Sequence, residues 1–196
     1  MFANRYTALV DACSLVGALR RNFLLSLAEE EFFRLRWSPQ ILEEAERALA
    51  RLFDERRLND SSKLAAKQIA TMSNAFPEAI VEDWDMLLSL GSGLPDPDDA
   101  HVLAAAVKVQ AQTIVTENIK DFPKSVLNPL NLEPRTADDF IADTISLDEA
   151  RAIQAIRRMR NRLKRPEKSP DALLRDCEAH GLIATADQLR PFVDLI

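Results

Sequence analysis

Residues 94–123 constrain the fold of this chain more than any other stretch, because they combine a capped helix with a short strand. Asp96 precedes Pro97, which favours a helix start, since proline lacks only an N–H that would be unpaired in the first turn. Residues 101–109 are almost all apolar, and the β-branched run 113–116 predicts a buried strand. A helix followed directly by a buried strand is half of a βαβ unit, so this stretch predicts a parallel sheet.

Hydrophobic spacing predicts that strands and helices alternate before the chain becomes all-helical. The predicted elements are strands at 6–10 and 32–37, helices at 15–29, from Pro39 onward and at 61–74, an ambiguous segment at 78–88, a last strand or edge at 130–132, and helices at 136–142, 146–164, 170–180 and 185–192. Ser146 and Glu149 have capping-box spacing, and Gly181 predicts a helix end. The pattern is typical of an α/β domain with a helical C-terminal region.

Charge and cysteine content exclude several classes of protein. The 196 residues carry a formal net charge of −6, which argues against simple coating of nucleic acid but leaves a local basic surface open. Cys13 and Cys177 are far apart and lack metal-binding spacing, so we expect no disulfide framework and no zinc site. Asp11 interrupts the apolar start, and no run approaches the roughly 18 apolar residues that span a bilayer. We therefore expect a soluble cytoplasmic protein without a membrane partner.

Acidic side chains stand where predicted strands end or helices begin. Asp11 follows the first strand, Asp96 and Asp99 lie at a helix start, and Asp121 follows the run 113–116. Ligands gather at the carboxyl ends of parallel strands, and clustered carboxylates need raised pKa values or a compensating cation. Mg²⁺ and Mn²⁺ prefer such oxygen ligands and can activate water for phosphodiester hydrolysis. The acids therefore favour metal-dependent nuclease chemistry.

The helix that begins at Pro39 supplies one further candidate acid. At about 100° per residue, Glu43 lies almost opposite the apolar arc, whereas Glu44 and Glu46 lie on its two flanks and can reach the edge of a core. Either of the two could contribute. Each acid also has a simpler explanation than metal binding. An N-cap role alone could explain Asp96, and acids on helices are mostly solvated. We expect His101 to be a structural hydrogen-bonding residue rather than a base or a ligand.

The order of these signals resembles the PIN domain family. The segments ALVDACSLVGALRR, WSPQILEEAERAL and LPDPDDAHVLAAAVKVQAQTIVTENIKDFP carry the resemblance, which covers about residues 6–140. It implies a central parallel sheet flanked by helices, and an acidic site drawn from the first strand's end, an early helix, the start of a later helix and the end of the fourth strand. Matched motif by motif, the resemblance assigns the metal-binding and catalytic roles to Asp11, Glu44, Asp99 and Asp121. It adds Asp96 as a further metal ligand, and it makes Thr116 and Asn118 supporting polar residues.

The chain looks most like the VapC-type toxins in their longer form, which has an added helical C-terminal region. This resemblance implies a Mg²⁺- or Mn²⁺-dependent endoribonuclease, usually a homodimer, that a small cognate antitoxin inhibits. It also implies a nuclease domain over residues 1–136 and a helical region over residues 137–196. Cys13 stands where many PIN domains have a small polar residue, and Asn118 where some have an aspartate.

A basic helix interrupts the acidic chain. Residues 151–168 contain eight basic side chains and one acid. An acidic catalytic pocket repels phosphate, so a nuclease needs nearby positive charge, which arginine supplies through bidentate contacts. The candidates for RNA or antitoxin binding are Arg157, Arg158, Arg160, Arg162, Lys164 and Arg165. The same residues could instead solvate one helix face and cover apolar neighbours.

Two alternatives to a ribonuclease remain open from the sequence. The first is a catalytically degenerate PIN domain that binds RNA or protein without cutting it. The second is another Mg²⁺ phosphohydrolase on an α/β sheet, such as a phosphatase. That class commonly uses an Asp-x-Asp pair after the first strand, whereas here Cys13 takes the second position. No glycine-rich phosphate loop is present either.

Overall fold

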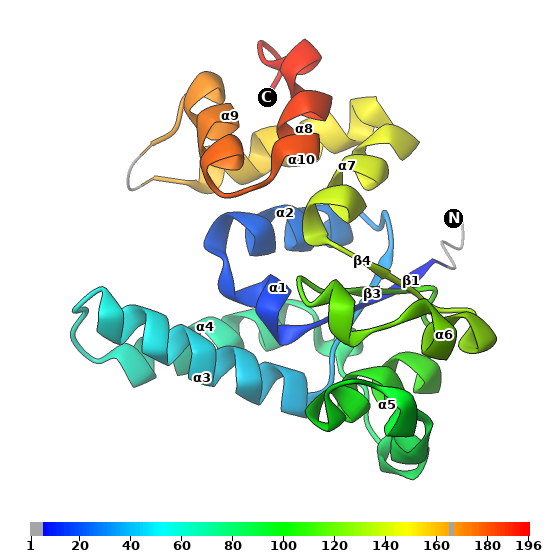
Figure 1. The fold of residues 1–196 in the computed structure, drawn as a ribbon. Coiled ribbons are helices and arrows are strands. Elements are labelled where there is room, and N and C mark those ends of the chain that lie inside the picture. Colours follow the sequence, from blue (N-terminus) through cyan, green and yellow to red (C-terminus); the bar gives the residue numbers. More distant parts are fainter. Residues whose placement is uncertain (1–5, 165–166) are drawn as a thin grey trace.

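Within the described residues, four parallel strands form the sheet at the centre of the molecule (Figure 1). The computed structural model describes residues 6–164 and 167–196. The strands are β1 (Thr7–Val10), β2 (Arg34–Arg36), β3 (Thr113–Val115) and β4 (Glu133–Arg135), arranged in the order β2-β1-β3-β4. Every residue of β1 and β3 is buried, as expected for central strands covered on both faces. The predicted α/β class with a parallel sheet is confirmed.

The strand register places the ends of β1 and β3 side by side. Val10 pairs with Val115, and the hydrogen bonding continues one residue further along each strand. The Asp11 N–H donates to the carbonyl oxygen of Val115 at 3.0 Å, and the Thr116 N–H donates to the carbonyl oxygen of Arg135 at 2.9 Å. The first polar residues after two neighbouring strands therefore lie at one edge of the sheet.

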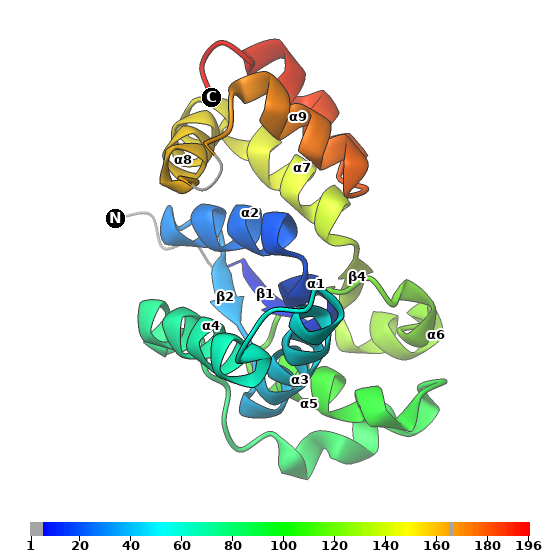
Figure 2. The same ribbon diagram turned by 90° about the vertical axis from the view of Figure 1, so that its left-hand side faces the viewer.

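Helices cover both faces of this sheet (Figures 1 and 2). The α-helices are α1 (Ala12–Val16), α2 (Ala18–Glu29), α3 (Pro39–Glu55), α4 (Ser61–Ala75), α5 (Ala100–Lys108), α6 (Lys124–Leu127), α7 (Ala137–Leu147), α8 (Glu149–Arg162), α9 (Pro170–Ala179) and α10 (Ile183–Leu189). Short 3₁₀ turns are η1 (Pro77–Ala79), η2 (Asp85–Gly93), η3 (Pro97–Asp99), η4 (Ile119–Asp121), η5 (Asn128–Leu130) and η6 (Arg190–Phe192). Helices α2 and α7 lie on one side of the sheet, and α3, α4 and α5 lie on the other.

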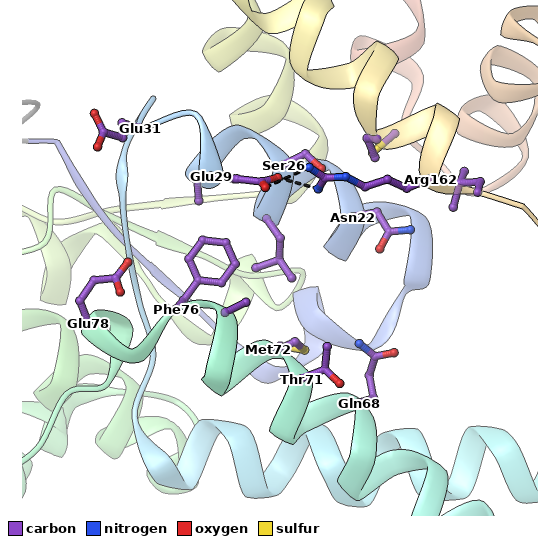
Figure 3. A pocket seen from close by; sticks show the side chains of 15 residues that line it. Asn22, Ser26, Glu29, Glu31, Gln68, Thr71, Met72, Phe76, Glu78 and Arg162 are labelled. Carbon is purple, nitrogen blue, oxygen red and sulfur yellow. Dashed lines mark hydrogen bonds and ion pairs between the residues drawn. The ribbon is translucent and has the colours of Figure 1, made fainter.

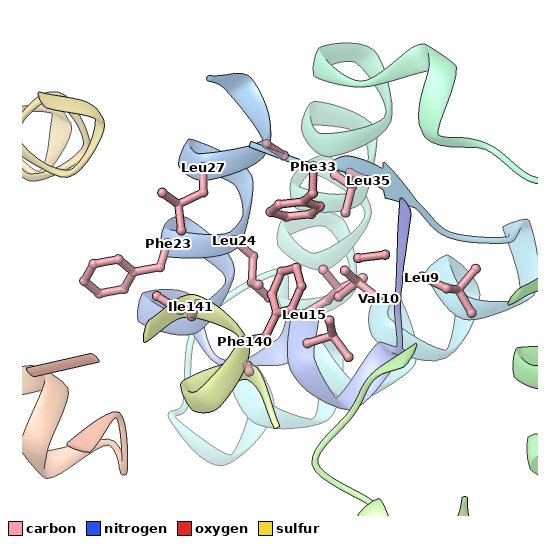
Figure 4. Close-up of a cluster of buried hydrophobic side chains, with 14 of the residues drawn as sticks. Leu9, Val10, Leu15, Phe23, Leu24, Leu27, Phe33, Leu35, Phe140 and Ile141 are labelled. Atoms are coloured by element: carbon pink, nitrogen blue, oxygen red, sulfur yellow. The ribbon is translucent and has the colours of Figure 1, made fainter. Parts of the chain in front are cut away.

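The core between the sheet and α2 also includes residues of α7 (Figure 4). Phe23 and Leu24 of α2 are fully buried, and so is Ile141 of α7. The Phe140 ring meets the Phe33 ring edge to face, with 4.9 Å between centroids. Because these aromatic side chains are shared, the first helix of the C-terminal region packs directly against the α/β layer.

Local capping explains where several elements begin and end. The Ser38 hydroxyl accepts a hydrogen bond from the Ile41 N–H at 3.1 Å, which confirms the predicted helix start at Pro39. The single helix predicted over 15–29 is wrong. Asp11 caps a helix that begins at Ala12, and extended backbone at Gly17 (φ −66°, ψ 114°) separates that helix from α2.

Three other predicted boundaries also differ. Asn131 has a left-handed conformation that ends η5, so the last strand begins at Glu133 rather than within 130–132. The ambiguous segment 78–88 is mostly 3₁₀ turn, and it forms a parallel bridge from Ile80 to Trp37, the residue directly after β2. The predicted capping box at Ser146 is wrong, because that residue lies inside α7 and Asp148 accepts the capping hydrogen bond of α8.

The C-terminal helices are joined to one another and to α2 by polar contacts. The Asp138 carboxylate of α7 accepts hydrogen bonds from the N–H groups of Ala184 (2.9 Å) and Thr185 (2.8 Å), the residues that begin α10. Gly181 has a φ of +76°, as predicted for a helix end, because glycine adopts this conformation without a steric penalty.

Along the described chain, none of the helices has the length and apolar character needed to cross a membrane.

Candidate active site

Asp11 is a buried carboxylate held at the end of β1. Its side chain is 4% exposed, and Oδ1 accepts a hydrogen bond from the Ala12 N–H at 2.6 Å. Oδ2 accepts a second bond from the Thr116 hydroxyl at 2.8 Å, and the Cys13 thiol lies 3.2 Å from the same oxygen. A buried carboxylate requires such donors, because an unpaired charge away from water is costly. The end of β3 therefore orients the acid at the end of β1.

Asp99 stands where η3 passes into α5, and other acids surround it. Burial, followed by the negative charges of four further carboxylates, raises the pKa of Asp99 to about 7. In order of decreasing effect, these belong to Asp11, Asp96, Asp121 and Glu44. The structure thus brings the five acids predicted to form the site within electrostatic reach of Asp99, although they come from four different segments of the chain.

Asp96 and Asp121 lie at the outer part of this cluster. The exposed Asp96 caps η3, because its carboxylate accepts a hydrogen bond from the Asp98 N–H at 2.9 Å. The capping role and the electrostatic role are therefore combined in one residue. Asp121 is half-buried at the end of η4, directly after β3. It was expected to follow a fourth strand, but in the described chain the ambiguous segment 78–88 makes a single bridge and no strand, so β3 is the third strand along the chain.

Glu44 reaches the cluster from α3. Its Oε1 lies 3.0 Å from Nε2 of His101, a residue that is 3% exposed. Of the two flanking acids that helix geometry allowed, Glu44 acts on Asp99, whereas Glu46 lines a separate surface groove of about 320 Å³. Glu43 is exposed and lies 4.0 Å from Arg47.

The two supporting polar residues differ in how the structure places them. Thr116 is fully buried, and its hydroxyl accepts a hydrogen bond from the Asn118 N–H at 3.1 Å while it donates to Asp11. Asn118 is exposed, and within the described chain its side-chain amide makes no hydrogen bond to the acids. Thr116 therefore has a clear structural role, and the Asn118 amide faces the solvent.

Further polar residues surround the site that the sequence did not assign to it. The Cys13 sulfur accepts a hydrogen bond from the Glu117 N–H at 3.2 Å and lies 3.3 Å from the Thr116 hydroxyl. Burial, followed by the charge of Asp11, raises the pKa of the Cys13 thiol to about 11, so the thiol stays protonated. The sequence offered one indication that Cys13 belongs to the site. It lies two residues after Asp11, and both residues follow the end of the same strand.

Glu117 connects the site with the start of the C-terminal helices. Its Oε1 accepts a hydrogen bond from the Ala137 N–H at 3.1 Å, the first residue of α7, and one from the Ser14 hydroxyl at 3.4 Å. Arg20 of α2 forms an ion pair with the same oxygen at 3.5 Å. Glu117 could be found from its place after β3, but its partners lie 20 and about 100 residues away.

The carboxylates fit a hard divalent cation in their chemistry. Burial and, after it, the negative charge of four other carboxylates raise the pKa of Asp99, and a bound divalent ion would offset both effects. Among residues 6–164 and 167–196, no three histidine, cysteine, aspartate or glutamate side chains lie close enough to hold an ion as they stand. The acidic side chains must therefore approach one another to enclose a metal.

The basic residues of α8 lie apart from the acids. Arg162 forms a bidentate pair with Glu29 of α2 at 2.6 and 3.0 Å, and Arg158 pairs with Glu30. Lys164 pairs with the nearby Glu167 at 3.8 Å. The Arg160 side chain donates to the carbonyl of residue 168, and Arg157 is exposed without a recorded partner in the described chain. Arg165 lies outside the described residues.

A groove of about 590 Å³ lies between α2, α4 and α8 (Figure 3). Leu25, Met72 and Phe76 supply much of its apolar lining, and the pair of Glu29 and Arg162 lies along one side. None of the five clustered acids lines this groove. The groove and the acidic site are therefore separate features.

Comparisons with known proteins agree with the α/β fold and with the helical C-terminal region. Residues 7–120 match the family model described as PIN domain, and residues 137–191 match the one described as VapC50 C-terminal domain. The chain is 40% identical over 76 residues to a protein of Mycobacterium tuberculosis (strain ATCC 25618 / H37Rv) named putative ribonuclease VapC50. The similar stretch covers 39% of this chain and 45% of that protein, so it spans less than half of the relative's length. No solved structure matches the chain.

Proposed function

The chain belongs to the PIN domain family, and from this premise we propose that it is a divalent-metal-dependent endoribonuclease, the toxin of a toxin–antitoxin pair. The similarity to a VapC-type protein named as a putative ribonuclease supports an RNA substrate, and the C-terminal match supports the longer form of that toxin. We also propose that residues 1–136 form the nuclease domain and 137–196 the helical region.

The observation that carries the proposal is that Asp11, Glu44, Asp96 and Asp121 lie close enough to the half-buried Asp99 to act on its charge, so that burial and these carboxylates raise its pKa to about 7. A fold gains no stability from crowding acids in this way, because each ionised carboxylate opposes the others. A bound divalent cation reverses this electrostatic cost. Functional sites are where such perturbed groups concentrate.

Four acids would hold the ion, namely Asp11, Glu44, Asp99 and Asp121, with Asp96 at the edge. When bound, Mg²⁺ or Mn²⁺ would lower the pKa of a water molecule and neutralise charge on the phosphodiester. Thr116 holds Asp11 in place through its hydroxyl. The solvent-facing amide of Asn118 could hydrogen-bond a scissile phosphate.

RNA and a small antitoxin are the proposed partners, and a homodimer is the proposed assembly. Arg157 is the residue of the basic helix that is exposed and without a recorded partner in the described chain, so it is the first candidate for a phosphate contact. Arg158 and Arg162 would have to exchange their pairs with Glu30 and Glu29 for such a contact. We therefore propose that these two mainly attach α8 to α2.

The alternative is a degenerate PIN domain that binds RNA or protein without cutting it. The spacing of the carboxylates favours this alternative, because no three described side chains of the required types are close enough to hold an ion. A phosphatase is disfavoured, since the position two residues after Asp11 holds the protonated thiol of Cys13 rather than a second carboxylate. Metal-dependent hydrolysis of RNA distinguishes the ribonuclease from the degenerate PIN domain.

The test is cleavage of a structured RNA by purified protein titrated with Mg²⁺ or Mn²⁺. We expect Asp11→Asn and Asp99→Asn to lose cleavage by about 100-fold or more, since each removes a charged ligand. Asp98→Asn is the matched control, because Asp98 is exposed on the same turn and is not among the acids that shift the pKa of Asp99. Equal cleavage by the wild type and the two site variants would refute the proposal. RNA binding without any metal-dependent cleavage would favour the degenerate domain.

A further inference from the structure

His101 makes the contact that links the two helices carrying Glu44 and Asp99. It lies on α5, two residues after Asp99, and its Nε2 is 3.0 Å from Oε1 of Glu44 on α3. The imidazole is almost wholly buried, and the Trp84 ring lies against it at a centroid distance of 5.9 Å. The contact therefore connects α3 with α5, two helices that lie more than 40 residues apart in the chain.

The chemistry of the two groups defines the direction of this hydrogen bond. An ionised carboxylate can only accept, so Nε2 of His101 must carry the proton and donate it. Within the described residues, the other ring nitrogen, Nδ1, is buried and has no hydrogen-bond partner. A buried polar group without a partner costs stability, so this arrangement calls for a compensating role.

Glu44 has no comparable restraint on its own helix. Gln40 approaches the carboxylate at 3.4 Å and Arg47 at 4.0 Å, and both distances are measured to Oε1. All contacts recorded for Glu44 in the described chain thus involve one oxygen, and Oε2 makes none. A glutamate on a partly exposed helix face otherwise samples several rotamers, and ordering it costs entropy.

We propose that His101 is a positioning residue that fixes Glu44 across the interface between α3 and α5 and leaves Oε2 available to a divalent cation. This inference rests on the proposed metal-dependent function. Hydrogen-bonding partners that hold a metal ligand typically contribute 10–100-fold to metal affinity. His101 contributes through the orientation of Glu44 and does not itself touch the ion.

The experiment measures Mn²⁺ affinity by calorimetry and by the electron paramagnetic resonance of bound Mn²⁺, without RNA. His101→Phe keeps a ring against Trp84 but removes the donor, and we expect at least tenfold weaker binding. His101→Gln restores an N–H donor and should recover part of the affinity. His180→Phe is the matched control, because His180 is the second of the two histidines in the chain. It is exposed at the C-terminal end of α9, and its ring lies at hydrogen-bond distance from the carbonyl oxygen of Asp176.

A double-mutant cycle tests whether His101 acts through Glu44. In a Glu44→Gln background, His101→Phe should cause little further loss of Mn²⁺ affinity. Full wild-type affinity in His101→Phe would overturn the positioning role, and so would an undiminished loss in the Glu44→Gln background. A His101→Gln variant no better than His101→Phe would overturn the hydrogen bond as the cause. Absence of Mn²⁺ binding by the wild type would instead refute the metal site itself, and with it this inference.

Discussion

The Thr116 hydroxyl donates a 2.8 Å hydrogen bond to Oδ2 of Asp11, joining two residues that are 105 positions apart in the chain. Both follow strands directly, and the parallel pairing of β1 with β3 brings them together. The same hydroxyl accepts a hydrogen bond from the Asn118 N–H. A single buried side chain thus organises the strand ends at the acidic site.

Replacing this side chain should damage both stability and the site. Thr116→Val preserves the shape but removes the shorter of two hydrogen bonds to Oδ2 of Asp11 and the acceptor of the Asn118 N–H, so we expect a loss of about 1–2 kcal/mol in the free energy of unfolding. Cleavage should also fall. Thr113→Val is the control, because Thr113 is equally buried on β3 and donates to the carbonyl oxygen of Glu133 away from the acids. Urea denaturation should show similar losses for both variants, and only Thr116→Val should weaken Mn²⁺ binding.

Asp99 should make the metal-free protein less stable as the pH rises. Its pKa is about 7 in the folded protein against an ordinary value of 3.8. Between these values the folded protein holds a proton that the unfolded chain has lost, so the free energy of unfolding decreases with rising pH. Because Asp99 is only partly buried, solvent screening reduces the effect to about 1–2 kcal/mol.

Asp99→Asn should remove this part of the pH dependence. Measured by urea denaturation in EDTA, the variant should gain about 1–2 kcal/mol relative to the wild type between pH 4 and pH 8. Saturating Mg²⁺ should flatten the wild-type curve, since the ion stabilises the ionised carboxylates. An unchanged pH slope in Asp99→Asn would show that the crowding of acids does not control the titration.

The close approach of Gly91 to Ala100 should be essential for the start of α5. A Cβ atom at Gly91 would lie 2.6 Å from Cβ and 2.8 Å from Cα of Ala100, so the backbone of η2 or α5 would have to move. Gly91→Ala should therefore cost about 1–3 kcal/mol. Gly93→Ala should cost less, because its Cβ would meet a side-chain methyl group of Val126 at 3.2 Å and no backbone atom within 4 Å. Thermal unfolding of the two variants compares these costs, and equal costs would contradict the steric argument.

Arginines on α8 should separate into two functional groups. Arg157→Ala should leave stability unchanged and lower the slope of log affinity for RNA against log salt by about 1, if this exposed residue contacts phosphate. Arg162→Ala should instead lose up to about 1 kcal/mol of stability with the exposed Glu29 pair. Fluorescence anisotropy with RNA in EDTA, at several salt concentrations, measures the first effect. An unchanged slope in Arg157→Ala would assign α8 to structure alone.

Local signals determined much of the fold without tertiary information. The Ser38 cap, the apolar run of α5 and the β-branched residues of β3 act within a few positions of the chain, so the sequence predicts these elements directly. The alternation of elements also predicted the parallel sheet. Where two local signals competed, the prediction was wrong. Asp148 rather than Ser146 caps α8, since the helix of Ser146 continues beyond it.

The environment of each acid was decided by the tertiary structure. The sequence placed Asp11, Asp99 and Asp121 at the ends of elements, but the pKa of Asp99 depends on burial and on charges from distant segments. Helix geometry allowed Glu44 and Glu46 equally, and the packing of α5 distinguished them by placing His101 beside Glu44. A sequence determines which side chains flank an element through short-range periodicity. Which of them share a buried environment depends on how the elements pack, because dielectric and charge interactions act through space rather than along the chain.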